Sequence, residues 1–405
     1  MKTVGIIAEY NPFHTGHSYQ IHYIREKLRA DFVVIVMSGD FVQRGTPALL
    51  DKYLRTKMAL LEGADLVLEL PVAFSTASAE FFAGGAVHIL QGLGVVDELC
   101  FGCEIADEPL LKRIAEVLVE EPVPYRESLQ EALGTGLSFP AARSRALSAY
   151  LGDPSAEPVL SSPNCILGIE YCKALLREGS SIRPSPLLRE GAGYHGISLE
   201  KDSFPSAAGI RAGAAADSAF DPTGLVPDTC LPLLKDALDQ KSYLTESDLD
   251  SLYAYRLLLE DAKSLRGYAD LSPALADRIN RFRTQYRSFD EFVALIKTKN
   301  LTRTHIQRGL LHMLLQLRES PTLPGYARVL GFQKNSTPLL SAIKKQGALP
   351  LLTKLSSASA LLSEEDQRLL AQTTFASNLF QMLITQKNGR PFLHEYSRPV
   401  VAKDQ

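Results

Sequence analysis

The chain has 405 residues, 45% of them apolar, and a formal net charge of −3 at pH 7. That much apolar sequence can bury a substantial core, and the length indicates roughly two or three domains. A net charge so close to zero excludes a strong global field for nucleic acid or membrane, so any such site must be local. The five cysteines are scattered and odd in number, which argues against a disulfide framework.

The N-terminal residues MKTVGIIAEYNPF lack the longer apolar run and the small-residue cleavage site of a signal peptide. No stretch of about 18 apolar residues is free of charges, so we expect no membrane span and no membrane partner. The cytoplasm is therefore the expected location. Nothing in the pattern indicates an oligomeric state.

The first hundred residues alternate between expected strands and helices. Strands are predicted over residues 3–8, 32–37, 64–70 and 98–102. Helices are predicted from near residue 14 to past residue 25, over 52–61 and over 78–90. Continuous apolar strands separated by helices are typical of a parallel sheet covered on both faces, so an α/β, Rossmann-like domain is expected over residues 1–225.

Residues 105–160 read as largely helical, and a further helix is predicted from Pro163, with Ser162 as its expected N-cap. An extended, proline-rich stretch over residues 181–196 and a short helix over 206–214 follow.

Beyond about residue 228 long helical patterns replace the strand signals. Residues 226–405 are therefore expected to form a separate, mainly α-helical C-terminal domain.

The strongest chemical signal is His14-Thr15-Gly16-His17, which follows an apolar strand and a short Asn-Pro-Phe turn and opens a helix. Such a helix start is expected to offer unpaired N–H groups and positive potential to phosphate. Two histidines three residues apart share one helical turn and can donate hydrogen bonds to charge developing on a transferring phosphate, while Gly16 allows close approach. The alternative, ordinary capping or surface histidines, is disfavoured by this strand–turn–helix context.

This HxGH pattern is the signature of the adenylyl-transferring superfamily that includes class I aminoacyl-tRNA synthetases and pantetheine-phosphate adenylyltransferase. With the stretches GIIAEYNPFHTGH, VMSGDFVQRGTPALLDKYLRTKMAL, GADLVLELP and SPNCILGIEY, the chain resembles the tRNA(Met) cytidine acetate ligase family over residues 1–211, with fainter echoes to the C-terminus. The resemblance implies a nucleotidyltransferase-type domain that forms acetyl-adenylate from acetate and ATP. It also implies acetyl transfer to N4 of the wobble cytidine of elongator tRNA(Met), giving N4-acetylcytidine.

The resemblance further implies that His14 and His17 are catalytic and that ATP is bound by the strand-to-helix segment and three later residues. These ATP-binding residues are Ile7, Ala8, Glu9, Tyr10, Asn11, Pro12, Phe13, His14, Thr15, Gly16, His17, Ser18, Tyr19, Gln20, Gly102, Asn164 and Arg189. Taken alone, Gly102 could equally be a plain strand-end glycine, Asn164 a helix cap and Arg189 a solvated charge.

The segment from Ser206 to Arg211 resembles the superfamily's second phosphate motif, Ser-Ser/Thr followed by Ile-Arg. Ala207 stands where the second hydroxyl is expected, so one side-chain contact is missing. Ser206 and Arg211 remain candidate phosphate contacts, with a routine amphipathic helix start as the alternative.

Candidate tRNA contacts come from two places. Arg44 and Arg55 follow the second strand, near Asp40, which could orient a substrate group. Residues 271–310 contain eight Lys or Arg but only three acidic residues, and aromatic residues are interleaved with the basic ones. This composition is typical of surfaces that neutralise RNA phosphates. The candidates here are Lys297, Lys299, Arg303 and Arg308, and the alternative throughout is solvated surface charge.

The remaining sequence patterns are weaker indicators of a functional site. The GxGxxG spelling over residues 191–196 follows a proline-rich segment, so no dinucleotide site is expected. Cys100 and Cys103 have no second pair at zinc spacing and read as structural cysteines. No dedicated metal cluster is visible in the sequence, and Mg²⁺ is expected only as the companion of ATP phosphates.

Two other functions remain open at this point. The first is a nucleotidyltransferase that adenylates a small phosphate ester such as phosphopantetheine. It would use the same histidines but leaves the helical extension unexplained. The second is a non-catalytic, nucleotide-dependent RNA-binding protein, against which the intact HTGH turn argues.

Overall fold

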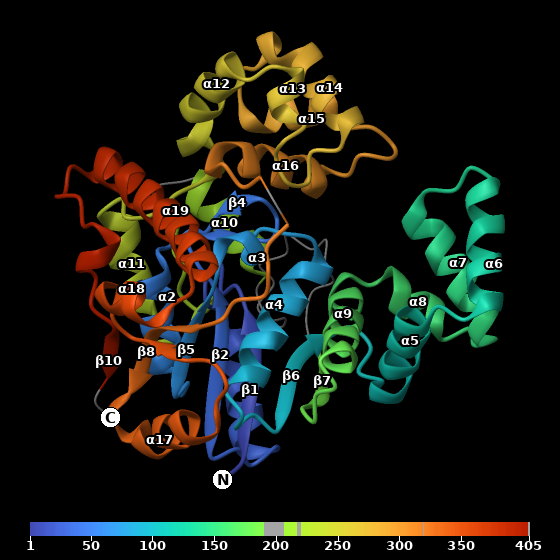
Figure 1. The fold of residues 1–405 in the computed structure, drawn as a ribbon. Coiled ribbons are helices and arrows are strands. Elements are labelled where there is room, and N and C mark those ends of the chain that lie inside the picture. The colour runs from blue at the N-terminus through green and yellow to red at the C-terminus, as the bar shows by residue number, and fades with distance from the viewer. Residues whose placement is uncertain (190–205, 217–219, 319, 404–405) are drawn as a thin grey trace.

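The computed structural model describes residues 1–189, 206–216, 220–318 and 320–403, so the GxGxxG spelling at 191–196 lies outside it. Its centre is a sheet with the strand order β10-β8-β5-β2-β1-β6-β7, in which β9 also pairs with β8 (Figure 1). The strands are β1 Thr3–Ala8, β2 Phe32–Ser38, β5 Leu66–Leu70, β6 Glu98–Cys103, β7 Arg183–Leu188, β8 Ala327–Gln333, β9 Leu351–Leu352 and β10 Val401–Lys403. The five strands β5-β2-β1-β6-β7 run parallel, which confirms the α/β expectation.

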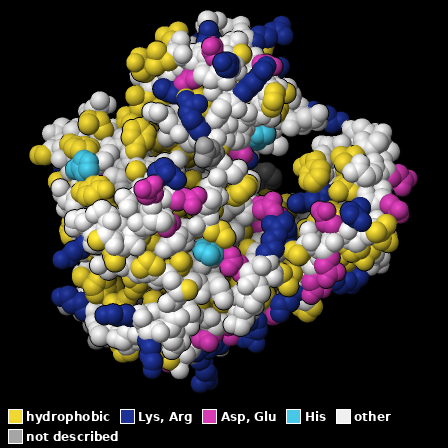
Figure 2. Space-filling model, viewed as in Figure 1, with side chains coloured by type: hydrophobic (Ala, Val, Ile, Leu, Met, Phe, Trp, Pro, Cys, Tyr) yellow, Lys and Arg dark blue, Asp and Glu magenta, His cyan; other side chains and the backbone are white. Residues whose placement is uncertain are grey.

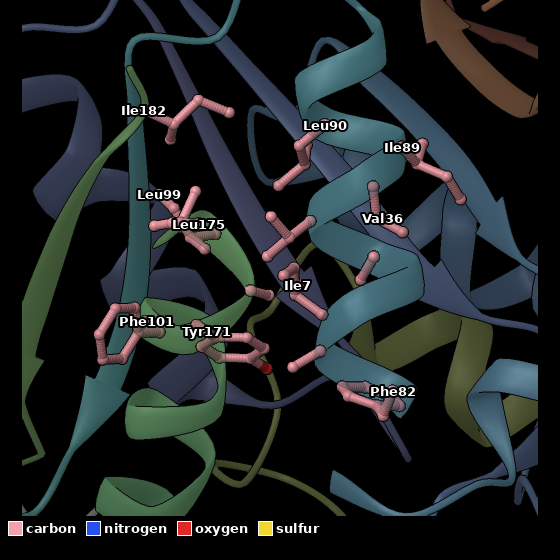
Figure 3. Packing of buried hydrophobic residues seen from close by; sticks show 14 of the residues in the cluster. Ile7, Val36, Phe82, Ile89, Leu90, Leu99, Phe101, Tyr171, Leu175 and Ile182 are labelled. Atoms are coloured by element: carbon pink, nitrogen blue, oxygen red, sulfur yellow. The ribbon is translucent and has the colours of Figure 1, made fainter. Parts of the chain in front are cut away.

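Alternating residues of the parallel strands supply two separate cores. On β2, Val33 and Ile35 belong to the core under α1 (Thr15–Glu26) and α2 (Lys52–Leu61), whereas Val34 and Val36 face the opposite layer. There, α4 (Ala79–Gly92) and α9 (Pro163–Arg177) cover the sheet. Figure 3 shows Val36 beside Ile89 of α4, and Tyr171 of α9 beside Phe101 of β6. Both faces are dry, which explains why these strands read as unbroken apolar runs.

The proline-rich stretch near residue 185 differs from expectation, because part of it is a strand. β7 pairs in parallel with β6 from Glu98–Arg183 to Cys103–Leu188. Pro184 and Pro186 are tolerated because β7 is the edge of the sheet, where a missing N–H leaves no neighbour unpaired.

Two helical lobes flank the sheet (Figure 1). One lies between β6 and α9 and contains α5 (Glu108–Glu120), α6 (Val123–Gly134), α7 (Phe139–Leu151) and α8 (Ala156–Ser161). The other contains α12 (Asp250–Leu259), α13 (Ala262–Leu265), α14 (Pro273–Phe282), α15 (Phe289–Ile296) and α16 (Arg303–Leu315), packed around an apolar core that continues onto Phe41, Val72 and the C-terminal helix residues Ala376, Phe380, Leu383 and Ile384. The space-filling view shows the surface hollowed between the two lobes (Figure 2).

After the second lobe the chain returns to the sheet. β8 pairs antiparallel with β5, and β9 and β10 pair with β8. The helices α17 (Thr337–Gln346) and α19 (Glu364–Asn388) complete this region. The sheet therefore draws strands from both sides of the expected boundary at residue 226, because β8 supplies the partner that the edge of β5 requires.

A buried ionic cluster joins the C-terminal region to α2 and β5. The Lys52 ammonium, fully buried, lies 2.6 Å from one carboxylate oxygen of Glu69 and 2.6 Å from one of Glu395. Arg328 of β8 contacts the same two carboxylates at 2.6 and 2.5 Å. Two cations thus meet two anions in a dry environment, where such pairing is needed to offset desolvation.

Within these described ranges, no helix is both long and apolar enough to cross a membrane.

Candidate functional site

The site begins where β1 ends and α1 starts. His14 is the N-cap of α1, and its Nδ1 atom accepts the backbone N–H of Gly16 at 3.1 Å. His17 Nδ1 in turn accepts the backbone N–H of His14 at 3.2 Å, so the two side chains form a reciprocal capping box. Because each Nδ1 is an acceptor, the proton of each neutral ring must sit on Nε2. The helix start therefore presents two Nε2–H donors.

The backbone amides at this helix start are already paired, which corrects the expectation that they would be open to phosphate. The amide of Thr15 donates to the Leu225 carbonyl at 3.2 Å, and that of Gly16 to the His14 ring. The amides of His17 and Ser18 both donate to the His14 carbonyl. Contacts with an anion at this turn are therefore expected from side chains, foremost the imidazoles and nearby cations.

Burial and neighbouring cations keep both rings neutral. Burial, followed by the charges of Arg189 and Arg211, lowers the pKa of His14 to about 3. Burial, His14 and Arg189 hold the pKa of His17 well below its ordinary value. The ring centroids lie only 3.7 Å apart, so two imidazolium charges would repel strongly. At neutral pH the pair is a set of uncharged donors in a positive field.

Two arginines from distant segments supply that field. Arg211 of α10 (Ala207–Ala216) donates to the Asn11 carbonyl at 2.6 Å, three residues before His14. The backbone of Arg189 follows β7 and bonds to the Cys103 carbonyl at 2.9 Å. A methyl group at Gly102 would lie 3.2 Å from Arg189 Cγ, so the missing side chain at Gly102 leaves room for the arginine stem.

The start of α9 is capped by a residue that sequence analysis missed. Glu104 accepts the backbone N–H of Asn164 at 3.2 Å, its side-chain amide at 2.7 Å and the N–H of Cys165 at 3.0 Å. The expected cap, Ser162, makes no capping bond, since its hydroxyl donates to the Pro158 carbonyl at 2.7 Å. An acid two residues after the predicted strand 98–102 was the only local signal for Glu104.

Several residues of the expected ATP-binding segment build the turn itself. Tyr10 adopts a left-handed backbone with φ of 48°, and its ring and that of Phe13 are buried under α1. Asn11 accepts the N–H of Leu49 at 2.7 Å, and Glu9 accepts that of Gln43 at 2.8 Å. Gln20 donates to the Cys100 carbonyl at 3.1 Å.

The remaining expected residues of this segment fall into the same framework. Ile7 and Ala8 end β1, and Pro12 lies in the turn. Thr15, Gly16, Ser18 and Tyr19 lie in the first turns of α1. Ser206 caps α10 by accepting the N–H of Gly209 at 3.0 Å.

The candidate tRNA-binding residues differ in whether they are buried or exposed. Arg55 is fully buried and donates to the carbonyls of Glu9 and Ser38, so its assignment to RNA is wrong: it holds the ends of β1 and β2 together. Asp40 is also buried, and burial raises its pKa to about 6. Arg44, by contrast, is exposed on the turn between β3 (Phe41–Val42) and β4 (Thr46–Pro47).

In the second lobe, Lys297, Lys299 and Arg303 are exposed, and Arg303 pairs with Asp290. Arg308 is mostly covered and bonds to Asp270 at 2.8 Å, so it supports the lobe. The β3–β4 turn packs directly on α16. A Cβ atom added at Gly45 would lie only 2.4 Å from the backbone nitrogen of Arg308 in that helix. Arg44 is thereby held next to the second lobe.

Known proteins resemble the chain over nearly its whole length. A model of the HIGH Nucleotidyl Transferase family matches residues 1–393. A tRNA(Met) cytidine acetate ligase from Clostridium perfringens is 39% identical over 374 residues, which cover 89% of this chain and 91% of the relative. One from Acetivibrio thermocellus is 38% identical over 414 residues, covering 99% and 100%.

Two crystal structures of Thermotoga maritima TmcAL are similar over the whole of both chains. The apo form has a TM-score of 0.93 at 30% identity, and the form bound with alpha-thio ATP has 0.89 at 29%.

Proposed function

Because the chain belongs to the tRNA(Met) cytidine acetate ligase family of HIGH nucleotidyl transferases, we propose that it is an ATP-dependent ligase acting on tRNA. The proposed substrates are ATP, acetate and elongator tRNA(Met), and the proposed product carries N4-acetylcytidine at the wobble position. The observation that carries the proposal is the stacked, neutral pair of His14 and His17 beside Arg189 and Arg211.

In the proposed first step, a carboxylate oxygen of acetate attacks the α-phosphorus of ATP, and the bond from that phosphorus to pyrophosphate breaks. Acetate is ionised at neutral pH, so the step needs no general base. The Nε2–H groups of His14 and His17 donate to oxygens that gain charge in the transition state. Preformed donors of this kind each contribute about 10²–10³-fold to such rates.

In the proposed second step, the N4 amine of cytidine attacks the carbonyl carbon of acetyl-adenylate. The bond between the acetyl carbon and the AMP oxygen breaks, and the amine loses a proton. Because the cytosine amine attacks as the neutral group, the protein contributes mainly by holding the two reactants together.

Mg²⁺ is proposed as a companion of the ATP phosphates, whose charge it would screen. Three described carboxylates that follow the strands β1, β2 and β6 are already hydrogen-bonded: Glu9 accepts the N–H of Gln43, Asp40 accepts that of Lys52, and Glu104 accepts three N–H groups. A cation that favours phosphate oxygens and water fits this arrangement.

We propose that residues 1–225 supply the catalytic part and that, within residues 226–405, the lobe α12–α16 contacts tRNA. Its exposed Lys297, Lys299 and Arg303 lie on the lobe that the β3–β4 turn, with Arg44, packs against. Lys and Arg side chains are visible across this lobe in Figure 2. Phosphate contacts from such a surface would orient the tRNA.

The direct test is incubation with labelled acetate, ATP and total tRNA, followed by nucleoside analysis. We expect the acetate label to appear in N4-acetylcytidine only when ATP is present. ATP–pyrophosphate exchange separates the alternative: exchange that depends on acetate supports the ligase, and exchange that depends on a phosphate ester such as phosphopantetheine contradicts it.

A further inference from the structure

Two of the five cysteines meet beside the nucleotide site. Cys103 is the last residue of β6, and Cys165 lies in the first turn of α9. Their sulfur atoms are 3.1 Å apart although the residues are 62 positions apart in sequence. Cys100, three residues before Cys103, belongs to the opposite core, because residues three apart on a strand point to opposite faces. The CxxC spelling therefore forms no pair, and the partner of Cys103 comes from α9.

We propose that Cys103 and Cys165 form a reversible redox pair, and that their disulfide weakens ATP binding. The coupling to ATP rests on the proposed function, whereas the disulfide itself does not. Gly102 directly precedes Cys103 and Asn164 directly precedes Cys165, so each thiol adjoins a residue assigned to the nucleotide.

The surroundings distinguish Cys165 from the other thiols. It lies at a helix N-terminus, where the helix dipole favours a thiolate, and the hydrogen bond from Cys103 lowers the pKa of its thiol. Burial instead raises the pKa of Cys100, Cys172 and Cys230 to about 12. Both sulfurs are buried, but their chain neighbours Gly102, Glu104 and Asn164 are half-buried, so a small oxidant would reach the pair by passing between partly exposed residues.

A peroxide is the class of oxidant that balances the chemistry. The Cys165 thiolate attacks one oxygen of hydrogen peroxide, whose O–O bond breaks, leaving a sulfenic acid and hydroxide. Cys103 then attacks the sulfenic sulfur, the S–S bond forms, and the departing hydroxide takes a proton to leave as water. In total two thiols are oxidised and one peroxide is reduced to two waters. A thiol reductant reverses the bond.

A metal ion is the competing explanation, since Cys103, Glu104 and Cys165 place ligand atoms within 4.8 Å of one another. The sulfur–sulfur distance of 3.1 Å lies between about 2.0 Å, as in a disulfide, and the roughly 3.8 Å that two thiolates span on a tetrahedral zinc, so the distance alone does not separate the two explanations. The carboxylate does. Glu104 is committed to three N–H donors at the start of α9.

Closing the bond requires the sulfurs to approach from 3.1 Å to about 2.0 Å, and we infer that β6 and α9 take up part of this movement. The same two segments carry Gly102 and Asn164, and displacements of that size in a binding site have large effects. We expect the oxidised protein to bind ATP about tenfold more weakly, and the reduced protein to recover its affinity.

The test uses the full chain, first reduced and then treated with hydrogen peroxide. Remaining thiols are alkylated under denaturing conditions, and peptides are mapped without reduction. The expected result is one disulfide, Cys103 to Cys165, with Cys100, Cys172 and Cys230 alkylated. ATP affinity is measured by calorimetry before oxidation, after it, and after dithiothreitol.

Variants sharpen the result. Cys103→Ser and Cys165→Ser should bind ATP with an affinity that peroxide leaves unchanged, while the control Cys172→Ala, on the same helix, should respond like the parent. Free Cys103 and Cys165 after oxidation would overturn the proposal, as would stoichiometric zinc held by these thiols, or a disulfide without any change in ATP affinity. If the reduced protein bound no ATP, the proposed function would fail, and the peptide map would still decide the thiol pair.

Discussion

The imidazole rings of His14 and His17 stack with their planes 27° apart, and each ring uses Nδ1 to cap the helix that it opens. The hydrogen bond at each Nδ1 thus serves two purposes: it pairs a backbone N–H group and it fixes the proton of that ring on Nε2. Fold and proposed chemistry can therefore be separated by substitutions that keep one role and remove the other.

His14→Asn should separate them. The asparagine oxygen can still accept the Gly16 N–H, as a good N-cap does, but it supplies no donor at the position of Nε2. We expect acetyl-adenylate formation to fall about 10²–10³-fold with little change in the free energy of unfolding. His14→Ala should lose the activity and also about 1 kcal/mol of stability. Equal activity in the parent and His14→Asn would contradict a donor role.

The low pKa of His14 predicts a pH-dependent stability. In the unfolded chain the ring titrates near its ordinary value of 6.5, whereas in the fold it titrates at about 3. Below pH 6.5 the unfolded state therefore binds the extra proton, and stability falls as the pH falls. Through His14 alone, the free energy of unfolding should fall by about 2 kcal/mol between pH 7 and pH 5.

Urea titrations at a series of pH values would measure this effect. The His14→Asn variant should show a shallower loss of stability between pH 6.5 and pH 5 than the parent. Buried Asp40, whose pKa is raised to about 6, acts in the opposite direction in the same range, so the difference between variant and parent is the relevant quantity. Parallel curves would show that His14 does not titrate as proposed.

Gly102→Ala should act through Arg189. The new methyl group would lie 3.2 Å from Arg189 Cγ, close enough to displace a flexible stem but not the backbone. We expect several-fold weaker ATP binding by calorimetry and an unchanged denaturation midpoint. Normal affinity in this variant would show that Arg189 does not need its present position to meet the nucleotide.

Local patterns were enough for much of the sheet and for the core of the site. The bounds of β1 and α2 agree with expectation residue by residue, because each element carries its own apolar periodicity. The histidines could also be found, since the strand, turn and helix that place them are consecutive.

Tertiary pairing is what local patterns could not supply. β8 pairs with β5 across roughly 260 positions of sequence, and no local signal encodes that partner. The paired amide of Thr15 depends on Leu225, and Glu104 acts on a helix some 60 positions away. Arg55 was assigned to RNA because a charge in a sequence does not show whether it is buried.

Charge reversal of exposed lysines should weaken tRNA binding selectively. Lys297 and Lys299 are both exposed, so replacing them in Lys297→Glu/Lys299→Glu should not disturb the packing of the lobe. Acetyl-adenylate formation should therefore stay at the parental level. Each lost phosphate contact should also reduce the slope of log affinity against log salt by about 1.

Filter binding at several salt concentrations would measure this, with Lys344→Glu/Lys345→Glu on α17 as the matched control. These two lysines are exposed, carry the same charge, and lie on a helix outside the α12–α16 lobe (Figure 1). Equal loss of tRNA affinity in both double variants would indicate a general charge effect and would contradict a role for the lobe.

The buried cluster around Lys52 predicts that the C-terminal region and the sheet unfold together. Lys52→Met would leave Arg328 as the one cation that pairs with both Glu69 and Glu395 among the described residues, and removing one member of a buried ion pair typically costs about 3–5 kcal/mol. Glu395 alone links η5 (Glu395–Ser397) to both cations, so Glu395→Gln should be destabilising as well, by a smaller amount because the amide can still accept a hydrogen bond. Fluorescence and far-ultraviolet circular dichroism should then report one shared transition at lower denaturant. If Lys52→Met instead produced two separate transitions, the C-terminal strands would be an appendage that the sheet can lose, and the cluster would not be what joins them.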